Sequence, residues 1–217
     1  MLRAAEEVKN RLFATAGKVL DEDPKRLMVR GKKFSLVTGG RDVPIDEILN
    51  SPGSPQKSLT ATGFATEDGK KGWRFGAQGV ELEIDSETGM IDVLRVVTAV
   101  DVGKAVNPPL VEGQLEGGVV MGLGYALHEE LSLDEGKTIN PTFSDYRVPF
   151  AQQIPPMQLI LLESPLAEGP FGAKGIGELG LFAIAPAVAN AVRQAVGIRI
   201  TELPMTPERV LAALEQK

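Results

Sequence analysis

The glycine-rich segment 113–130 constrains the fold of this chain more than any other feature. Its small and apolar residues recur at helical spacing, yet glycines occupy positions 113, 117, 118, 122 and 124. Each glycine inside a helix costs about 1 kcal/mol relative to alanine, because its backbone loses more conformational freedom. We therefore expect a helix whose glycines allow another part of the protein to pack closely against it.

Strands and helices alternate irregularly along the chain, which favours an α+β fold of mixed sheets packed with helices. A loop rich in proline and serine at 50–55 separates an N-terminal helix–hairpin region, 1–57, from an α+β region, 58–217. Hydrophobic periodicity and turn residues predict helices at 2–20, 45–49, 178–196 and 207–214, hairpins over 27–37 and 79–100, and strands at 58–65, 157–162 and shortly before 207.

Composition and charge exclude several classes of function. The 217 residues carry a formal charge of −6 without a basic block, which argues against nucleic acid or an anionic membrane as partner. The chain has no cysteine and one histidine, His128, which excludes disulfides, thiolate nucleophiles, iron–sulfur ligation and a multi-histidine metal site. No apolar run reaches the roughly 18–20 residues of a membrane span, and the first residues form a charged helical pattern rather than a signal peptide. We therefore expect a cytoplasmic protein.

The segment 169–178 places four glycines directly before an apolar predicted helix. Backbone N–H groups of such a loop can approach a ligand closely, and a helix N-terminus favours an anionic group. Lys174 would add a positive charge, and Glu178 would be an acid in the first helical turn. The alternative interpretation is a connector that lets the chain turn sharply. The segment is not a P-loop, because Gly175 rather than serine or threonine follows Lys174, and no clear strand precedes it as in a Rossmann fingerprint.

The segment 101–118 also departs from regular patterns. Asn107 precedes Pro108 and fits an N-cap or a turn residue. Gln114 lies at the start of the glycine-rich helix, where its amide could both donate to and accept from a polar heterocycle. The alternative is an ordinary surface glutamine in the first turns of a helix.

Three motifs follow one another along the chain. They are DVGKAVNPPLVEGQLEGGVVMGLGYALHEE at 101–130, DYRVPF at 145–150 and GAKGIGE at 172–178. Together they resemble the C-terminal part of the molybdopterin-binding (molybdenum) subunit of the xanthine dehydrogenase/aldehyde oxidase family, in order and in spacing. The first helix and hairpin also resemble the stretch upstream of these motifs, so the resemblance covers nearly the whole chain. It implies the α+β fold of the C-terminal half of that family's cofactor-binding domain.

The resemblance implies molybdenum hydroxylase chemistry, which is the oxidative hydroxylation of an aldehyde or an N-heterocycle such as a purine with water as oxygen source. The family binds a molybdopterin cofactor, often as a dinucleotide, whose dithiolene holds the molybdenum, so no side chain here is implied as a metal ligand. Glu178 corresponds to the family's general base and Gln114 to its cofactor-contacting glutamine. The residues that would lie along the cofactor, mostly through backbone contacts, are Lys174, Gly175, Ile176 and Gly177.

The implied assembly is larger than this chain. The family's molybdenum subunit is several times longer, and its other cofactor loops and substrate-orienting residues are not found in this sequence. The resemblance therefore implies a larger molybdenum-binding partner, iron–sulfur clusters and FAD on partner subunits, and no activity without them. A helix N-terminus and Lys174 would keep Glu178 ionised, as a general base requires. Two other hypotheses stay open: a non-catalytic scaffold that retains the fold, and an unrelated anion- or nucleotide-binding domain built on 172–178.

Overall fold

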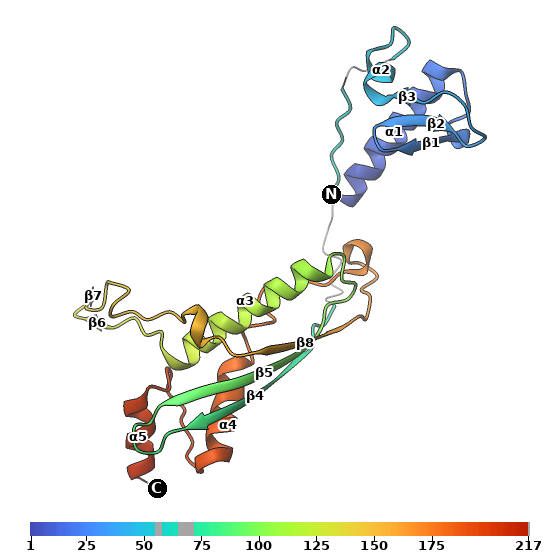
Figure 1. Ribbon diagram of the computed structural model, residues 1–217. Helices are drawn as coiled ribbons and strands as arrows, with labels where there is room; N and C mark the ends of the chain where they lie inside the picture. The colour runs from blue at the N-terminus through green and yellow to red at the C-terminus, as the bar shows by residue number, and fades with distance from the viewer. Residues whose placement is uncertain (55–57, 65–71, 217) are drawn as a thin grey trace. The chain divides into compact units, whose positions relative to one another are not determined.

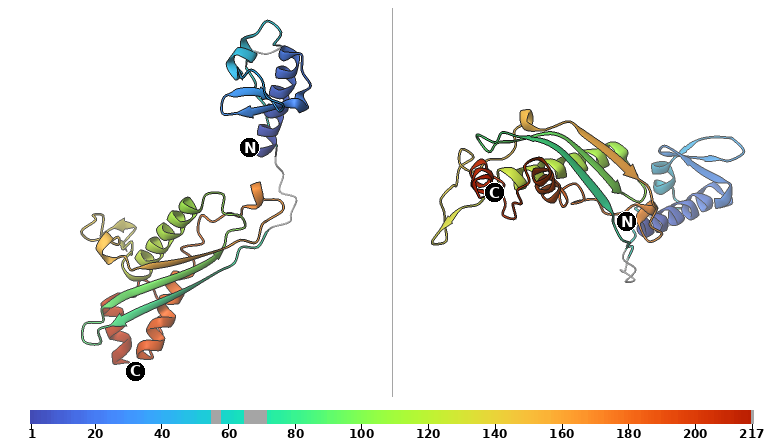
Figure 2. Two further views of the ribbon diagram at one scale, coloured as in Figure 1. Left: turned by 45° about the vertical axis from the view of Figure 1, so that its right-hand side comes forward. Right: turned by 90° about the horizontal axis from the view of Figure 1, so that it is seen from below.

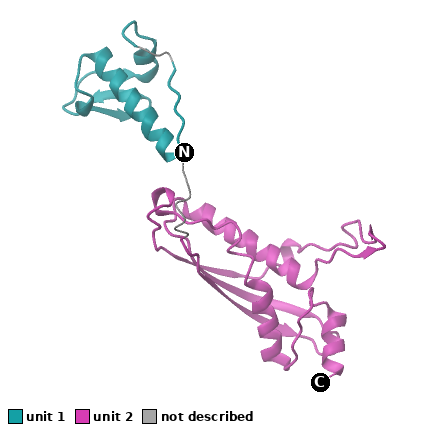
Figure 3. Ribbon diagram, turned by 180° about the vertical axis from the view of Figure 1, so that it is seen from behind, with its two compact units in different colours: residues 1–70 teal, residues 71–217 magenta. Residues whose placement is uncertain are grey.

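The computed structural model describes residues 1–54, 58–64 and 72–216 (Figure 1). The chain divides into two compact units, residues 1–70 and 71–217 (Figure 3). The limits of the two regions expected from the sequence, 1–57 and 58–217, stay a prediction. None of the helices in the described part of the chain is long and apolar enough to cross a membrane.

The first unit packs one long helix and one short helix against a small antiparallel sheet with the order β1-β2-β3. Ala16, Leu27, Phe34 and Ile48 form its core, and the ring of Phe34 meets that of Phe13 edge-on at 5.2 Å. The predicted helices and hairpin of this unit are confirmed. Its elements are α1 (Leu2–Leu20), η1 (Pro24–Arg26), β1 (Leu27–Arg30), β2 (Lys33–Leu36), β3 (Val43–Pro44) and α2 (Ile45–Asn50).

The strand predicted at 58–65 is wrong for residues 58–64, which form no strand; residue 65 lies outside the described residues. Carbonyl groups of this segment accept hydrogen bonds from arginines of α1 instead of from a neighbouring strand. Arg11 donates to the Thr60 carbonyl at 3.0 Å and Arg3 to the Phe64 carbonyl at 2.9 Å. Backbone carbonyl groups need a hydrogen-bond donor, but a side chain can serve as well as a neighbouring strand. Arginine side chains are the donors here.

The second unit is built on a sheet with the order β4-β5-β8, in which β5 pairs antiparallel with β4 and parallel with β8. Helices α3 and α4 cover the same face of this sheet (Figure 2). The α+β prediction, the 79–100 hairpin and the 157–162 strand are confirmed. The elements are β4 (Gly76–Ile84), β5 (Ile91–Asp101), α3 (Pro108–Leu127), β6 (Leu133–Asp134), β7 (Lys137–Thr138), η2 (Ala151–Gln153), β8 (Met157–Leu162), η3 (Pro170–Gly172), α4 (Ile184–Val196) and α5 (Pro207–Glu215).

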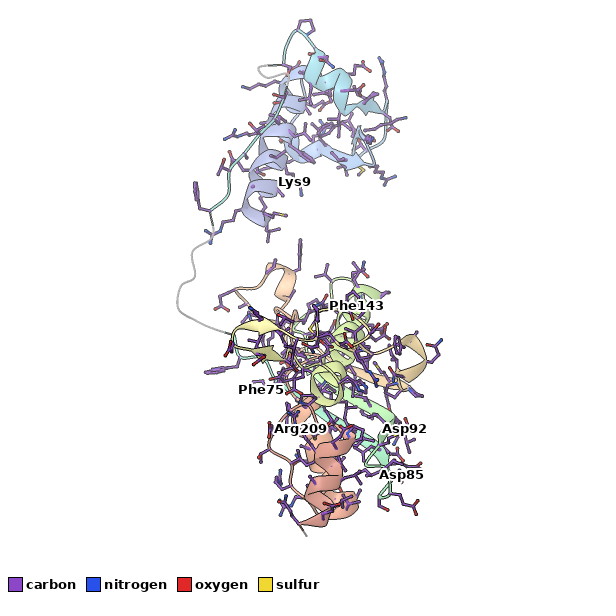
Figure 4. The ribbon with its side chains drawn as sticks, turned by 90° about the vertical axis from the view of Figure 1, so that its left-hand side faces the viewer. Lys9, Phe75, Asp85, Asp92, Phe143 and Arg209 are labelled. Atoms are coloured by element: carbon purple, nitrogen blue, oxygen red, sulfur yellow. The ribbon has the colours of Figure 1, made fainter. Side chains whose placement is uncertain are left out.

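Turn chemistry fixes the ends of several of these elements. At the β4–β5 turn the Asp85 carboxylate accepts hydrogen bonds from the amides of Glu87 and Thr88, at 2.8 and 3.2 Å (Figure 4). Asn107 caps α3 by accepting from the Leu110 amide, so the helix begins five residues before the predicted start at 113. Gly197 ends α4 in the left-handed conformation, as predicted.

The core of the second unit lies between the sheet and its two covering helices. Val96 from β5, Val119 and Leu123 from α3, and Ile184 and Val188 from α4 are almost fully buried there. Burial of each such side chain contributes about 1.5–3 kcal/mol, so this contact holds both helices on the sheet.

The close packing expected against the glycine-rich helix is provided by the chain entering α4. A Cβ placed on Gly118 would lie 2.8 Å from the Cα of Gly180, and one on Gly122 would lie 2.7 Å from the Cβ of Ile184. By contrast, a Cβ on Gly113 or Gly117 would meet no atom within 4 Å in the part of the chain that the structure describes. Two of the five glycines therefore serve the packing of α4 and its preceding turn.

The helix predicted from 178 begins only at Ile184, so Glu178 lies in a run of turns and not in a first helical turn. Pro186 accounts for this. A proline inside a helix lacks the N–H that should donate four residues back, and its ring clashes with that carbonyl. A start at 184 places Pro186 in the first turn, where no such bond is required.

The short strand predicted before 207 is also wrong, since residues 197–206 form no strand. Ile198 and Ile200 are buried in the core, which explains the apolar pattern. Here the amide of Met205 donates to the carbonyl of Ala126 at 2.7 Å, so the segment pairs with the end of α3 rather than with the sheet.

The glycine contact predicts opposite effects of the same substitution at neighbouring positions. Gly118→Ala should lower the free energy of unfolding by about 1–3 kcal/mol, because the backbone at Gly180 must move. Gly117→Ala should raise it by about 0.4–1 kcal/mol, because the added methyl enters open space and alanine favours the helix. Urea unfolding of the two variants measures this difference, and equal effects would contradict the account.

Candidate functional site

Two loops meet beside the N-terminal half of α3, one following β5 and one following η3. The amide of Lys174 donates to the Val102 carbonyl at 3.0 Å, and that of Lys104 to the Gly172 carbonyl at 2.9 Å. Gly103 has φ +71°, and a Cβ there would collide with the Gly172 carbonyl oxygen. Only glycine fits this position, because the backbone is left-handed there and lies directly against the backbone of another loop. The 101–130 and 172–178 motifs are thus parts of one structure.

A buried ion pair joins the same two loops. The Lys174 ammonium lies 2.7 Å from the Asp101 carboxylate, and the two side chains are only 9% and 10% exposed. The other carboxylate oxygen of Asp101 accepts from the amides of Gly103 and Ser164 at 3.0 and 3.2 Å. The hydrogen bond from Lys174, with these two amides, lowers the pKa of the Asp101 carboxyl below its ordinary value.

This pair corrects the role that we expected for the charge of Lys174. The ammonium is neutralised by Asp101 within the fold and is not free to attract an anion or to stabilise the Glu178 carboxylate. Sequence reasoning missed Asp101, although an acid at the buried end of an apolar strand requires a charged partner. That requirement was the signal that could have found it.

Gln114 and Gly177, both singled out in the sequence, lie together in the structure. The Gln114 side-chain amide donates to the Gly177 carbonyl at 2.9 Å, across 63 residues of chain. A groove of about 430 Å³ lies beside this contact. Its lining comes from both loops and from the start of α3: Val102, Lys104, Val106, Asn107, Leu110, Val111, Gln114, Ala173, Lys174, Ile176 and Gly177.

Glu178 follows the groove residue Gly177 and is exposed. Its carboxylate makes no hydrogen bond or ion pair with any residue that the structure describes, whereas its backbone carbonyl accepts from the Leu181 amide at 3.0 Å. The first-turn position expected for Glu178 is wrong, since α4 starts at Ile184. The carboxylate is therefore available among the described residues, and it does not lie in the first turn of α4, whose N-terminus was expected to stabilise its charge.

The loop between Lys174 and Glu178 offers unpaired backbone donors. Within the described ranges, the N–H groups of Gly175, Ile176 and Gly177 donate to no protein acceptor. A Cβ on Gly175 would lie 3.2 Å from the guanidinium of Arg74, a cation that sequence reasoning did not single out. Free N–H groups, an arginine and an open groove suit a polar ligand with anionic oxygens, such as a pterin carrying phosphate.

The described side chains include no group of three or more His, Cys, Asp or Glu placed to hold a metal ion. The free N–H groups of Gly175, Ile176 and Gly177 and the groove beside Gln114 fit the polar part of a molybdopterin, whose own sulfur atoms would hold the metal.

Comparisons with known proteins decide the family. Residues 1–155 match the family described as "Molybdopterin cofactor-binding domain". A 6-hydroxypseudooxynicotine dehydrogenase complex subunit gamma from Paenarthrobacter nicotinovorans is 30% identical over 220 residues, which span 97% of this chain and 28% of that subunit. A xanthine dehydrogenase molybdenum-binding subunit from Escherichia coli O157:H7 is 36% identical over 138 residues, 63% of this chain and 18% of that protein. This chain belongs to the xanthine dehydrogenase/aldehyde oxidase family of molybdenum-binding subunits.

Solved structures of molybdenum hydroxylases agree with this assignment. Quinoline 2-oxidoreductase from Pseudomonas putida 86 superposes with a TM-score of 0.79 at 27% identity, over 99% of this chain and 29% of that one. The Cu,Mo-CO dehydrogenase gives a TM-score of 0.78 at 26% identity, over 98% and 28%. The chain thus spans less than a third of the length of these relatives of the family. Gln114 lies inside the matched range 1–155, and Lys174 to Glu178 lie beyond it.

The buried pair predicts that substitutions of Lys174 and Lys104 lower the free energy of unfolding by unequal amounts. Lys174→Met should lower the free energy of unfolding by about 3 kcal/mol or more, because it leaves the buried Asp101 carboxylate unpaired. Lys104→Met removes the Lys104–Glu163 pair, whose side chains are 52% and 36% exposed, and should cost far less, because water and salt screen an exposed ion pair. Urea unfolding at neutral pH measures both values.

The same pair makes this cost depend on pH. Because the pKa of Asp101 is lowered in the folded state, the stabilisation is fully present above the unfolded pKa of about 3.9 and is lost as the pH falls through the folded pKa. The free energy of unfolding of the wild type should therefore exceed that of Lys174→Met by less in acid than at neutral pH. The account would be contradicted if Lys174→Met lowered the free energy of unfolding only as much as Lys104→Met does. It would also be contradicted if the effect of Lys174→Met did not change in acid.

Proposed function

We propose that this chain forms one wall of the molybdopterin site of a molybdenum hydroxylase and supplies its general base, Glu178. The observation that carries the proposal is the hydrogen bond from Gln114 to Gly177. It brings the two motifs together at one groove and leaves the next side chain, Glu178, exposed and unpaired among the described residues.

The residues around the groove contact different parts of the cofactor. The free N–H groups of Gly175, Ile176 and Gly177 donate to cofactor oxygens, and Gln114 presents its amide at the same edge. Lys174 acts through its backbone carbonyl, since its ammonium is bound to Asp101 and its N–H to the Val102 carbonyl. Arg74 beside Gly175 adds the positive charge that a phosphate or a dinucleotide extension requires.

Glu178 acts as the proton acceptor. The cofactor supplies the two-electron oxidation of the substrate carbon when it is bound. A carboxylate that pairs with no neighbour is free to accept the proton of the attacking oxygen, and proton transfer to a well-placed base contributes about 10²–10⁴-fold to a rate. The substrate class is an aldehyde or an N-heterocycle such as a purine, in keeping with relatives named for xanthine, quinoline and hydroxypseudooxynicotine.

The site needs a larger partner to become complete. Along α3, Leu110, Met121 and Tyr125 are 72%, 60% and 57% exposed, and Gly113 and Gly117 leave open space beside them. Phe75 and Phe143 are also largely exposed (Figure 4). Exposed apolar surface of this extent marks an interface. We infer that a larger molybdenum-binding part covers it and closes the groove, that iron–sulfur and FAD subunits take the electrons, and that the chain alone is inactive.

Replacement of the base tests the proposal in the assembled hydroxylase. Glu178→Gln should lower kcat by about 10²–10⁴-fold, because the amide cannot accept the proton. The molybdenum content should stay at the wild-type level, because the substitution keeps the shape of the side chain. Steady-state kinetics together with elemental analysis separate the two effects.

Glu168→Gln provides the matched control, since Glu168 is also an exposed loop carboxylate and makes no hydrogen bond or ion pair in the described structure. It should leave kcat within about twofold of the wild type, as surface changes usually do. Full turnover by Glu178→Gln would rule out the general base, and loss of molybdenum in that variant would assign Glu178 to cofactor binding instead.

A further inference from the structure

Gln78 on β4 makes three side-chain hydrogen bonds, and two of them reach the turn after Glu178. Its amide nitrogen donates to the Gly180 carbonyl at 2.9 Å and to the Thr98 hydroxyl at 3.0 Å. Its amide oxygen accepts from the Ala183 N–H at 3.1 Å. The amide nitrogen thus makes two donor bonds and the amide oxygen one acceptor bond, and these serve one turn and one strand residue.

The turn needs these bonds because it is not helical. In a continuous helix the Gly180 carbonyl would accept from the Ile184 N–H, and the Ala183 N–H would donate to the Leu179 carbonyl. Here the Ile184 N–H donates to Leu181 instead, at 3.3 Å, and α4 starts without a side-chain cap of its own. Gln78 therefore pairs with two of the backbone groups that have no helical partner because α4 starts late.

The sheet fixes Gln78 in place. Along β4 it shares the inward-facing register with Val80, Leu82 and Ile84, so it is the polar member of an apolar row. Its partner across the ladder is Thr98 of β5, which is only 1% exposed. The Thr98 hydroxyl orients the amide, and the rigid hairpin transmits that orientation to the turn.

We propose that Gln78 is a positioning residue for Glu178, an inference that rests on the proposed function of Glu178. Two side-chain amides hold the glycine carbonyls on either side of the carboxylate: Gln114 binds Gly177, and Gln78 binds Gly180. The Leu181 N–H closes the turn onto the carbonyl of Glu178 itself. A base displaced by about 1 Å can lose about 10²-fold in rate, so both anchors contribute to catalysis without touching the reacting atoms.

The first test measures the turn in this chain without cofactor. Gln78→Met keeps the length of the side chain and removes all three hydrogen bonds, and Gln158→Met makes the same change at an exposed position of β8. Hydrogen exchange of the Ala183 amide, followed by NMR, should accelerate at least about tenfold in Gln78→Met and stay within about twofold in Gln158→Met. Unchanged exchange in Gln78→Met would overturn the proposal.

The second test is a double-mutant cycle in the assembled hydroxylase. With Glu178 present, Gln78→Met should lower kcat about tenfold and change KM by less than about twofold. In the Glu178→Gln background the same change should alter kcat by less than about twofold, because a positioning residue has nothing left to position. An equal loss in both backgrounds shows a merely structural role and overturns the proposal.

Two further outcomes are informative. If Gln78→Met does not fold, Thr98→Val replaces it, since it removes only the hydroxyl that orients the amide; it should accelerate Ala183 exchange about threefold, and no acceleration overturns the proposal. If Glu178→Gln alone retains full turnover, the proposed function fails. That result is distinguishable, because accelerated exchange in Gln78→Met would still show that the amide holds the turn.

Discussion

The contact between Gly118 and Gly180 is the constraint on which the rest of the second unit depends. Backbone lies on backbone there, and a Cβ on Gly180 would collide with the Leu115 carbonyl oxygen. This approach brings the chain between Lys174 and Ile184 down onto α3. Only at this distance can Gln114 reach Gly177 from one side and Gln78 reach Gly180 from the other. The glycines lower the intrinsic stability of the helix, and the close packing that they allow offsets this cost.

The segment from Lys174 to Glu178 has a buried, charge-paired start and an exposed end without partners among the described residues. At its start, Lys174 is buried and paired with Asp101, so this end serves the fold. Beyond it, free N–H groups and the unpaired Glu178 carboxylate face no partner within the described residues, so this end is available for chemistry. A rigid start, two amide anchors and an exposed acid are what a preorganised base requires.

Sequence reasoning recovered those features that depend on local pattern. The periodicity of 2–20 and 207–214, the turn residues of the β4–β5 hairpin and the need for a close neighbour of the glycine-rich helix all lead to the observed elements. It failed where tertiary partners decide. The apolar run from Leu179 is typical of a helix, but Pro186 delays its start, and arginines of α1 replace the expected strand ladder at 58–64.

Some residues of the site could likewise be predicted from the sequence, and others only from the structure. Gln114 and Gly177 were found through motifs, whereas Asp101, Gln78 and Arg74 act through contacts between distant segments. Gln78 did leave a signal, because a glutamine in the inward register of an apolar strand must find hydrogen-bond partners. The signal shows that partners exist but does not identify them. For that the positions of Gly180 and Ala183 were needed.

The measurement that tests the central claim most directly is the metal and pterin content of this protein purified under native conditions from its own cells. The account predicts that it elutes with a larger molybdenum-binding part, with molybdenum and pterin in equal proportion to the chain and with iron from the electron-carrying subunits. A folded chain that elutes alone, without molybdenum or pterin, would contradict the account and reduce its relation to the hydroxylases to common ancestry.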